Sequence, residues 1–269
     1  MVAGAALIDG HVHLHGCYAL DGALDAAVEN LDNACEGLNL PAETPFFLWL
    51  VEQGERGAER LHEKSRGRWS VDEPGGASLR LTRSSDGRRI TAIRGRQVRT
   101  AEDLEVLAVG SEQHVNGNRP LADTIEACME QEALVMLPWG FGKWTGSRGR
   151  AIIAAFEHYS ARGLRLADTG ARTRFLPASP VLARSIAAGL PVFVGSDPFP
   201  FADQVSTIGR HGFVLDGVGF GAGWEDLHRV IRALEGQPRR FGRLFGAVEF
   251  ATLQGKMQVR KRLGGGRSS

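Results

Sequence analysis

Short apolar segments alternate with amphipathic helical segments, and this alternation constrains the fold more than any other feature. Apolar runs typical of buried strands lie at 5–9, 45–51, 133–137, 164–167, 191–194 and 213–215. Helical patterns lie between several of them, as in 21–36, where Leu24, Val28 and Leu31 share one helix face. Strands that alternate with helices form parallel βαβ units. The chain is therefore predicted to be an α/β protein with a TIM-like (β/α) barrel, either regular or in a distorted seven-stranded form.

Residues 66–109 depart from this alternation. Leu79 and Leu81 alternate with polar residues, 84–87 has the composition of a turn, and 89–93 reads as a returning strand. This pattern predicts an antiparallel hairpin. We expect one barrel domain over residues 1–258, with 66–109 as an antiparallel hairpin excursion. The Gly-rich and polar residues 259–269 are expected to form a flexible tail.

The charge balance is close to neutral. The chain of 269 residues has 32 basic and 31 acidic residues, which gives a net charge of +1. This provides no electrostatic argument for nucleic acid or an anionic membrane, so we expect a small-molecule substrate and no nucleic-acid partner. The sequence has no apolar run long enough to cross a membrane, and we expect no signal peptide. Its 3 cysteines are widely spaced, so a reducing cytoplasm is the expected location.

Polar and glycine-rich clusters follow four of the apolar segments. They occupy residues 11–16, 138–149, 168–174 and 195–200. In a parallel barrel these clusters lie at the carboxyl ends of the strands, where βα loops form active sites. The four clusters are therefore expected to meet at one site.

The histidines of the first cluster provide the sharpest local signal. Successive side chains alternate along a strand, so His11 and His13 project to one side. Two neutral imidazoles in this arrangement can hold one metal ion at about 2.0–2.1 Å, with positions left for a carboxylate and water. The alternative is that these histidines only form hydrogen bonds to their neighbours.

Asp197 follows a buried strand and a Gly-Ser turn. Its carboxylate could ligate the metal ion or accept a proton from water activated at the site. Helix capping is the alternative, because Asp and Ser favour N-caps. The Pro-Phe-Pro sequence that follows delays any helix and weakens that alternative.

Cations and aromatic residues in the other clusters are candidates for substrate binding. Lys143, Arg148 and Arg172 lie in glycine-containing loops, where they could meet an oxyanion or phosphate. Trp139 and Trp144 could form the wall of such a pocket. The alternative is that the cations are ordinary surface residues and that Arg172 pairs with Asp168.

Two short motifs resemble known metal-dependent hydrolases. LIDGHVHLH at 7–15, with GSD at 195–197, resembles the PHP (polymerase and histidinol phosphatase) family and the amidohydrolase superfamily. Residues 95–109 look more like a PHP segment. The resemblance implies a divalent ion, zinc, manganese or iron, held by His11, His13 and Asp197. The chain departs from the PHP pattern at Gln97, where the family has Glu, and at Leu107 or a neighbour and at Phe199, where it has His. A single metal ion is therefore expected.

Two functional hypotheses follow. In the first, the chain is a metal-dependent hydrolase of a small molecule, with a phosphoester slightly preferred over an amide. Asp197 and Lys143 would be catalytic, and Arg148, Arg172, Trp139 and Trp144 would bind substrate. In the second, the chain is a degenerate PHP-like barrel that binds an anionic ligand without catalysis.

Overall fold

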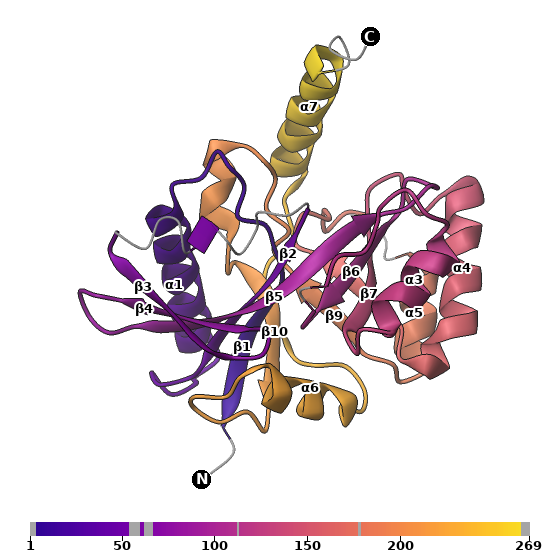
Figure 1. Cartoon of the computed structure of the whole chain (residues 1–269). Coiled ribbons are helices and arrows are strands. Elements are labelled where there is room, and N and C mark those ends of the chain that lie inside the picture. Colours follow the sequence, from indigo (N-terminus) through magenta and orange to yellow (C-terminus); the bar gives the residue numbers. More distant parts are fainter. Residues whose placement is uncertain (1–3, 54–59, 62–66, 112, 177–178, 265–269) are drawn as a thin grey trace.

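A computed structural model describes residues 4–53, 60–61, 67–111, 113–176 and 179–264. Figure 1 shows a curved sheet with helices packed around it. The strands are β1 (Ala5–Val12), β2 (Phe46–Glu52), β3 (Trp69–Gly75), β4 (Ser78–Arg83), β5 (Arg89–Arg99), β6 (Glu105–Val109), β7 (Leu134–Pro138), β8 (Arg165–Thr169), β9 (Val192–Gly195), β10 (His211–Asp216) and β11 (Arg240–Gly242). The helices are α1 (Leu20–Gly37), α3 (Leu121–Met129), α4 (Gly146–Tyr159), α5 (Pro180–Ala187), α6 (Trp224–Arg232) and α7 (Ala247–Gly264), with short 3-10 helices η1 (Ser160–Arg162) and η2 (Ala202–Thr207).

The strands form a nearly closed, barrel-shaped sheet. Nine of the described strands follow the order β11-β10-β1-β2-β5-β6-β7-β8-β9. The last of them, β9, returns to the side of β1, where the amide of Asp197 donates a hydrogen bond to the carbonyl of His11 at 2.8 Å. The chain is thus a mixed α/β protein, which confirms the predicted α/β class. The sheet does not have the regular alternation of a TIM barrel or a clear seven-stranded form.

The departure from the predicted barrel arises from two reversed strands. β6 is antiparallel to both β5 and β7, and β10 is antiparallel to β1. Only residues 100–104 connect β5 to β6, which is too short for the crossover that a parallel pair requires. The remaining barrel strands β1, β2, β5, β7, β8, β9 and β11 run in one direction. Their carboxyl ends therefore meet at one end of the barrel, opposite the chain's N-terminus in Figure 1.

The predicted hairpin is confirmed, but its extent is corrected. β4 and β5 are antiparallel, and Leu79 pairs with Ala92 and Leu81 with Ile90. However, β5 continues to Arg99 and also pairs with β2 and β6. Because β5 and β6 are barrel strands, only β3 and β4 lie outside the barrel path, rather than the whole of 66–109.

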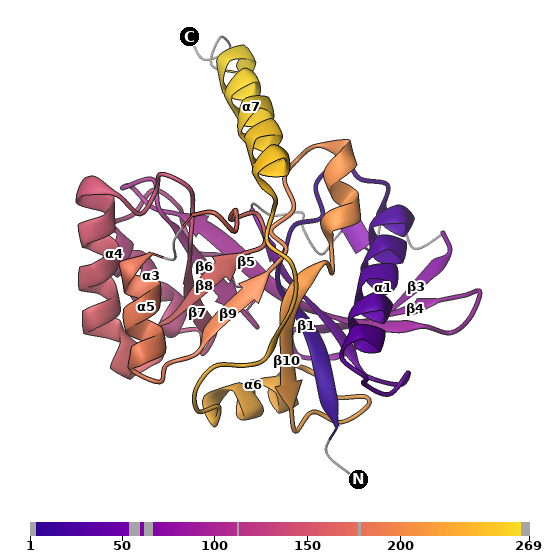
Figure 2. The same ribbon diagram turned by 180° about the vertical axis from the view of Figure 1, so that it is seen from behind.

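The C-terminal segment also differs from its expectation. α7 continues to Gly264, so residues 259–264 are helical rather than part of a frayed tail, while 265–269 lie outside the described residues. Figure 2 shows α7 standing away from the barrel. None of the described helices has the length and apolar character needed to cross a membrane. The division into one domain over 1–258 stays a prediction.

The barrel interior is filled by aromatic side chains. The Trp49 ring lies 5.5 Å from Phe193 and 5.4 Å from Phe213, centroid to centroid, in edge-on contacts. All three side chains are fully buried. Two further apolar clusters pack outside the sheet, one beneath α1 and one beneath α3, α4 and α5. Packed edge-on aromatic rings are a stabilising arrangement, and they provide a rigid support for the end of β1.

Candidate metal centre

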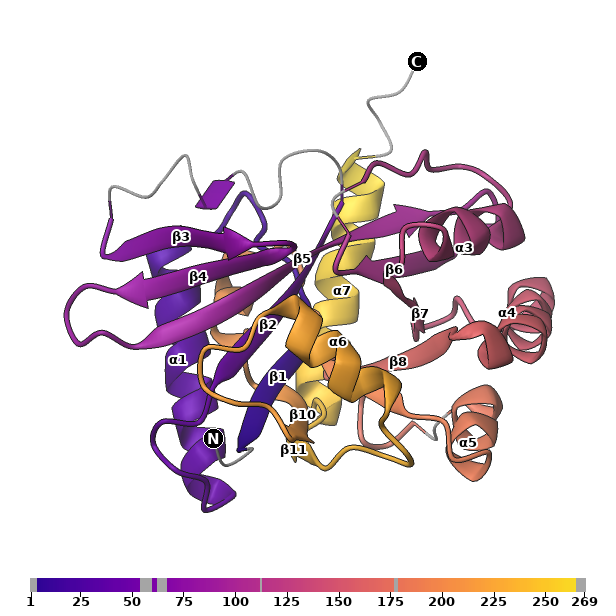
Figure 3. The ribbon, with the colours of Figure 1, turned by 60° about the horizontal axis from the view of Figure 1, so that its bottom comes forward.

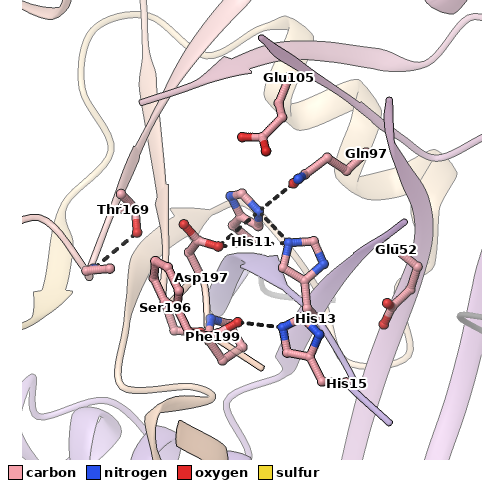
Figure 4. A network of polar contacts seen from close by, with 12 residues as sticks. His11, His13, His15, Glu52, Gln97, Glu105, Thr169, Ser196, Asp197 and Phe199 are labelled. Atoms are coloured by element: carbon pink, nitrogen blue, oxygen red, sulfur yellow. Dashed lines mark hydrogen bonds and ion pairs between the residues drawn. The ribbon is translucent and has the colours of Figure 1, made fainter. Parts of the chain in front are cut away.

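Two histidines and one aspartate converge at the carboxyl end of β1. His11 and His13 come from β1 and the residue after it, and Asp197 from the loop after β9. The two Nε2 atoms are 3.0 Å apart, and Asp197 Oδ1 lies 3.5 Å from His11 Nε2 and 3.8 Å from His13 Nε2. One ligand atom from each residue therefore lies within 4.8 Å of the others. Figure 4 shows the three side chains facing a common point.

Both imidazoles are held in the neutral form. Burial lowers the pKa of His11 to about 4 and that of His13 to about 3. At neutral pH each ring therefore offers an unprotonated nitrogen, which is the form that binds metal ions. The alternation along the strand, which predicted that these side chains share one side, agrees with their placement.

Asp197 has a backbone conformation that is uncommon for a residue with a side chain. Its φ is 49°, in the left-handed region, which non-glycine residues adopt mainly where the surrounding structure enforces it. Burial raises the pKa of its carboxyl, while His13, the Thr169 hydroxyl and Lys143 favour the ionised form. The strained backbone directs this carboxylate toward the two histidines.

Asp9 anchors the two segments that carry these residues. It is fully buried and accepts hydrogen bonds from Ser196 N at 2.8 Å, Ser196 Oγ at 2.5 Å, Gly209 N at 2.8 Å and His11 N at 3.3 Å. Burial raises its pKa to about 7 despite these hydrogen bonds. Asp9 thereby links β1 to the loop that carries Asp197. Sequence reasoning assigned it no role, although it stands inside the LIDGHVHLH motif.

Residues from β5 and β6 complete the surroundings. Gln97 Oε1 lies 3.2 Å from His11 Nε2, so this amide occupies the position beside the histidines that the family resemblance assigned to Glu. Glu105 lies near His11 and raises its pKa. Leu107, in contrast, is a fully buried core residue of the barrel interior. The spacing in the sequence could not have identified Glu105, because its position depends on the reversed strand β6.

His15 and Phe199 contact other parts of the protein rather than the ligand group of His11, His13 and Asp197. The His15 Nε2 atom is 2.9 Å from the carbonyl of Pro198. Phe199 packs against the apolar cluster of Ala171, Phe245 and Leu253, and its carbonyl accepts a hydrogen bond from Tyr18. Phe199 therefore provides an apolar contact where the family pattern has His.

The structure separates the other predicted site residues. Lys143 lies at the margin of the site, with Nζ 2.5 Å from Glu105 Oε1. Arg148 contacts Asp103 at 3.2 Å and the Gly142 carbonyl at 2.9 Å.

Arg172 forms a two-point contact with the buried Asp168, at 2.9 and 2.8 Å, as the alternative interpretation had it. Trp139 and Trp144 pack against the apolar cluster beneath α3 and α4. The structure thus brings together His11, His13, Asp197 and Lys143. The assigned roles of Arg148, Arg172 and the two tryptophans toward substrate stay predictions.

The comparisons with known proteins find a shared fold. No family model matches the sequence, and no curated protein sequence matches it significantly. PsfC from Pseudomonas syringae PB-5123 is similar in structure, with a TM-score of 0.53 and 15% identity over 97% of this chain and 99% of that one. The lesion-specific endonuclease PfuEndoQ from Pyrococcus furiosus has a TM-score of 0.52 and 13% identity over 88% of this chain. An endonuclease Q complex with a 27-mer duplex substrate has a TM-score of 0.50 and 13% identity. The chain spans 57% and 60% of these two endonuclease chains.

These neighbours are consistent with the PHP-like fold that the motifs implied, and they correct one expectation. The near-neutral net charge led to the expectation of no nucleic-acid partner. That expectation is wrong, because a structural neighbour holds duplex DNA with an abasic lesion at its active site. Net charge sums over the whole surface, whereas nucleic acid contacts only the local charges near a site.

The amide of Gln97 allows a direct test of its contribution to the centre. Gln97→Glu keeps the side-chain length and adds a negative charge beside His11. We expect it to tighten binding of a divalent ion by about tenfold, because carboxylates are stronger ligands than amides. Competition with a chromophoric chelator measures this affinity. Gln113→Glu, at an exposed position, is the matched control, and equal affinities in both variants would show that Gln97 does not face the ion.

Proposed function

We propose that this chain is a hydrolase of phosphoesters that uses one divalent metal ion held by His11, His13 and Asp197. The observation that carries this proposal is the convergence of two neutral imidazoles and a carboxylate at the carboxyl end of the barrel. In barrel enzymes, this end is where the loops form active sites.

The donor set fits a divalent ion. The two Nε2 atoms face each other at 3.0 Å, and the carboxylate of Asp197 and the amide oxygen of Gln97 lie beside them. Two imidazole nitrogens with oxygen ligands suit zinc, manganese or iron. When bound, such an ion would act as a Lewis acid and lower the pKa of water at the site.

The protein's own groups would supply proton transfer and charge stabilisation. Burial raises the pKa of Asp197 in the metal-free protein, and its carboxylate would accept a proton from water at the site. Lys143, held in place by Glu105 at 2.5 Å, would stabilise the negative charge that develops on phosphoryl oxygens. Asp9 would keep His11 and the loop of Asp197 in register through its four hydrogen bonds.

A phosphoester is favoured over an amide by the charges around this end of the barrel. The exposed Arg260 of α7 donates a hydrogen bond to the Pro200 carbonyl at 2.8 Å. It lies close enough to His15 to lower the pKa of that imidazole. Together with Lys143 it provides positive charge near the centre, which suits a phosphate group. Because PfuEndoQ, a structural neighbour, is a lesion-specific endonuclease, a DNA phosphodiester belongs among the first substrates to test.

The second candidate is a barrel that binds an anionic ligand without catalysis. Gln97 and Phe199 favour it, since both replace ligands of the family pattern with side chains that cannot carry a negative charge or bind a metal ion strongly. This candidate shares the same cations and the same histidines. It differs from the first in predicting binding without turnover.

Metal removal and reloading separate these candidates. The full chain is treated with a chelator and reloaded with zinc, manganese or iron(II). It is then assayed with p-nitrophenyl phosphate, bis(p-nitrophenyl) phosphate, a duplex with an abasic site and an anilide. We expect turnover of a phosphoester that disappears on chelation and returns with one of the metals. Phosphoester binding without turnover in the reloaded protein would favour the second candidate. Turnover that survives both chelation and Asp197→Asn would contradict the proposed centre.

A further inference from the structure

A cavity lies at the opposite end of the barrel from the candidate metal centre. It has a volume of about 550 Å³ and lies between the start of β2, the hairpin of β4 and β5, and the loop before α6. Its lining includes Phe46, Arg80, Arg88, Arg89, Thr91 and Phe220. Figure 3 looks toward this end of the molecule. A volume of this size is typical of small-molecule sites.

The two sites are separated by the length of β1. Phe46, at the edge of the cavity, pairs with Leu7 near the beginning of β1, whereas His11 lies near its end. The four residue steps from Leu7 to His11 span roughly 13 Å of strand. The cavity is therefore independent of the proposed phosphoesterase centre, and a ligand in it would not contact the metal ligands.

Arg80 and Arg89 form no ion pair with an acidic side chain among the described residues, although Asp72 lies opposite Arg80 in the pair of β3 and β4. Arg80 lies opposite Thr91 in the antiparallel pair, and Arg89 lies two residues before Thr91, so all three side chains share one face of the sheet. An anion bound between two such guanidinium groups would be stabilised by both. Arg88 differs, because it pairs with Asp32 and stacks over the Phe46 ring at 4.7 Å.

The cavity also presents an exposed aromatic ring. Phe220 is 63% exposed, in a loop that turns at Gly221 with a φ of +83°. The Arg89 guanidinium lies 5.5 Å from the centre of this ring. A large apolar ring exposed beside two cations forms a surface that can stack on a planar group while the cations bind an anion. Glu43 is the acidic residue of the lining, so the cations outnumber it.

We propose that this cavity binds a phosphorylated ligand with a planar ring, the chemistry of a nucleotide. The phosphate would lie between Arg80 and Arg89, and the ring would stack on Phe220. Guanidinium groups suit this role because their planar N–H donors match phosphate oxygens.

Adenosine 5′-monophosphate, AMP, is the probe for this site. Calorimetric titration of the chelator-treated full chain excludes phosphate binding through a metal ion. We expect Arg80→Gln/Arg89→Gln to weaken AMP binding by about tenfold or more. We expect Phe220→Ser to weaken AMP binding while binding of inorganic phosphate stays unchanged. Arg119→Gln/Arg150→Gln, which neutralises two exposed arginines elsewhere, is the matched control and should bind AMP as the wild type does.

Thermal unfolding checks that the loss is not a folding defect. Because neither arginine forms an ion pair among the described residues, the Arg80→Gln/Arg89→Gln variant should have about the same Tm as the wild type without ligand. AMP should then raise the Tm of the wild type and not that of the variant. A short single-stranded oligonucleotide is also tested. Tighter binding than AMP, lost in the same arginine variant, would identify a nucleotide within a nucleic-acid strand as the ligand of this cavity. No AMP binding by the wild type, or equal binding by the variant, would overturn the proposal.

Discussion

The His11→Ala/His13→Ala variant is expected to lose its divalent ion and its metal-dependent turnover while it remains folded. The two Nε2 atoms, 3.0 Å apart, would supply two of the three proposed ligand atoms, and Asp197 alone would not hold an ion against water. Because both imidazoles are buried in their neutral form, their removal costs apolar contacts rather than a buried charge. Elemental analysis, turnover and circular dichroism measure the three outcomes.

A matched control uses histidines away from the centre. His114→Ala/His158→Ala removes two exposed imidazoles and should leave metal content and turnover unchanged. Asp197→Asn provides a second route if the double variant is destabilised, since it removes the carboxylate charge and keeps the side-chain shape. Unchanged turnover in the His11→Ala/His13→Ala variant would refute the assignment of the centre.

Replacing Gly195 by alanine is expected to destabilise the chain and disrupt the centre together. A Cβ atom at this position would lie 2.2 Å from His11 N, 2.6 Å from His11 Cβ and 2.8 Å from Gly10 C. These contacts are mostly with backbone, so β9 must move away from β1 to relieve them. The separation would weaken the hydrogen bond from Asp197 N to the His11 carbonyl. We expect a loss of about 3 kcal/mol in the free energy of unfolding and weaker metal binding.

The control for this substitution is Gly16→Ala, close to the site in the sequence. A Cβ atom at Gly16 would meet nothing within 4 Å, so its stability should stay within about 0.5 kcal/mol of the wild type. Denaturant unfolding and metal titration of both variants measure the difference. If Gly195→Ala has the stability and metal affinity of the wild type, then β9 and β1 do not pack as closely at Gly195 as the contacts above indicate.

Local patterns in the sequence were sufficient for the residues at the end of β1. The two-residue alternation of a strand places His11 and His13 on one side whatever the rest of the fold does. The Gly-Ser-Asp turn after an apolar run likewise indicated that Asp197 follows a strand. The antiparallel hairpin was predictable for the same reason, because Leu79 and Leu81 alternate with polar residues before a turn.

Longer-range features were not predictable from the sequence. Glu105 reaches the site because β6 is reversed, and neither hydrophobic periodicity nor spacing shows strand direction. Lys143 and Arg172 both lie in glycine-containing loops, yet one pairs with Glu105 at the site and the other with Asp168. The choice between such partners depends on which carboxylates the fold buries, since a buried carboxylate requires a partner.

The most direct test of the account is the metal content of the full chain. The protein is loaded with zinc, manganese or iron(II), freed of excess metal and subjected to elemental analysis beside Asp197→Asn. The account predicts about one equivalent of a divalent ion in the wild type and a clear loss of it in the variant. A wild-type protein that retains no metal after loading would contradict the central claim, and so would a variant with undiminished metal content.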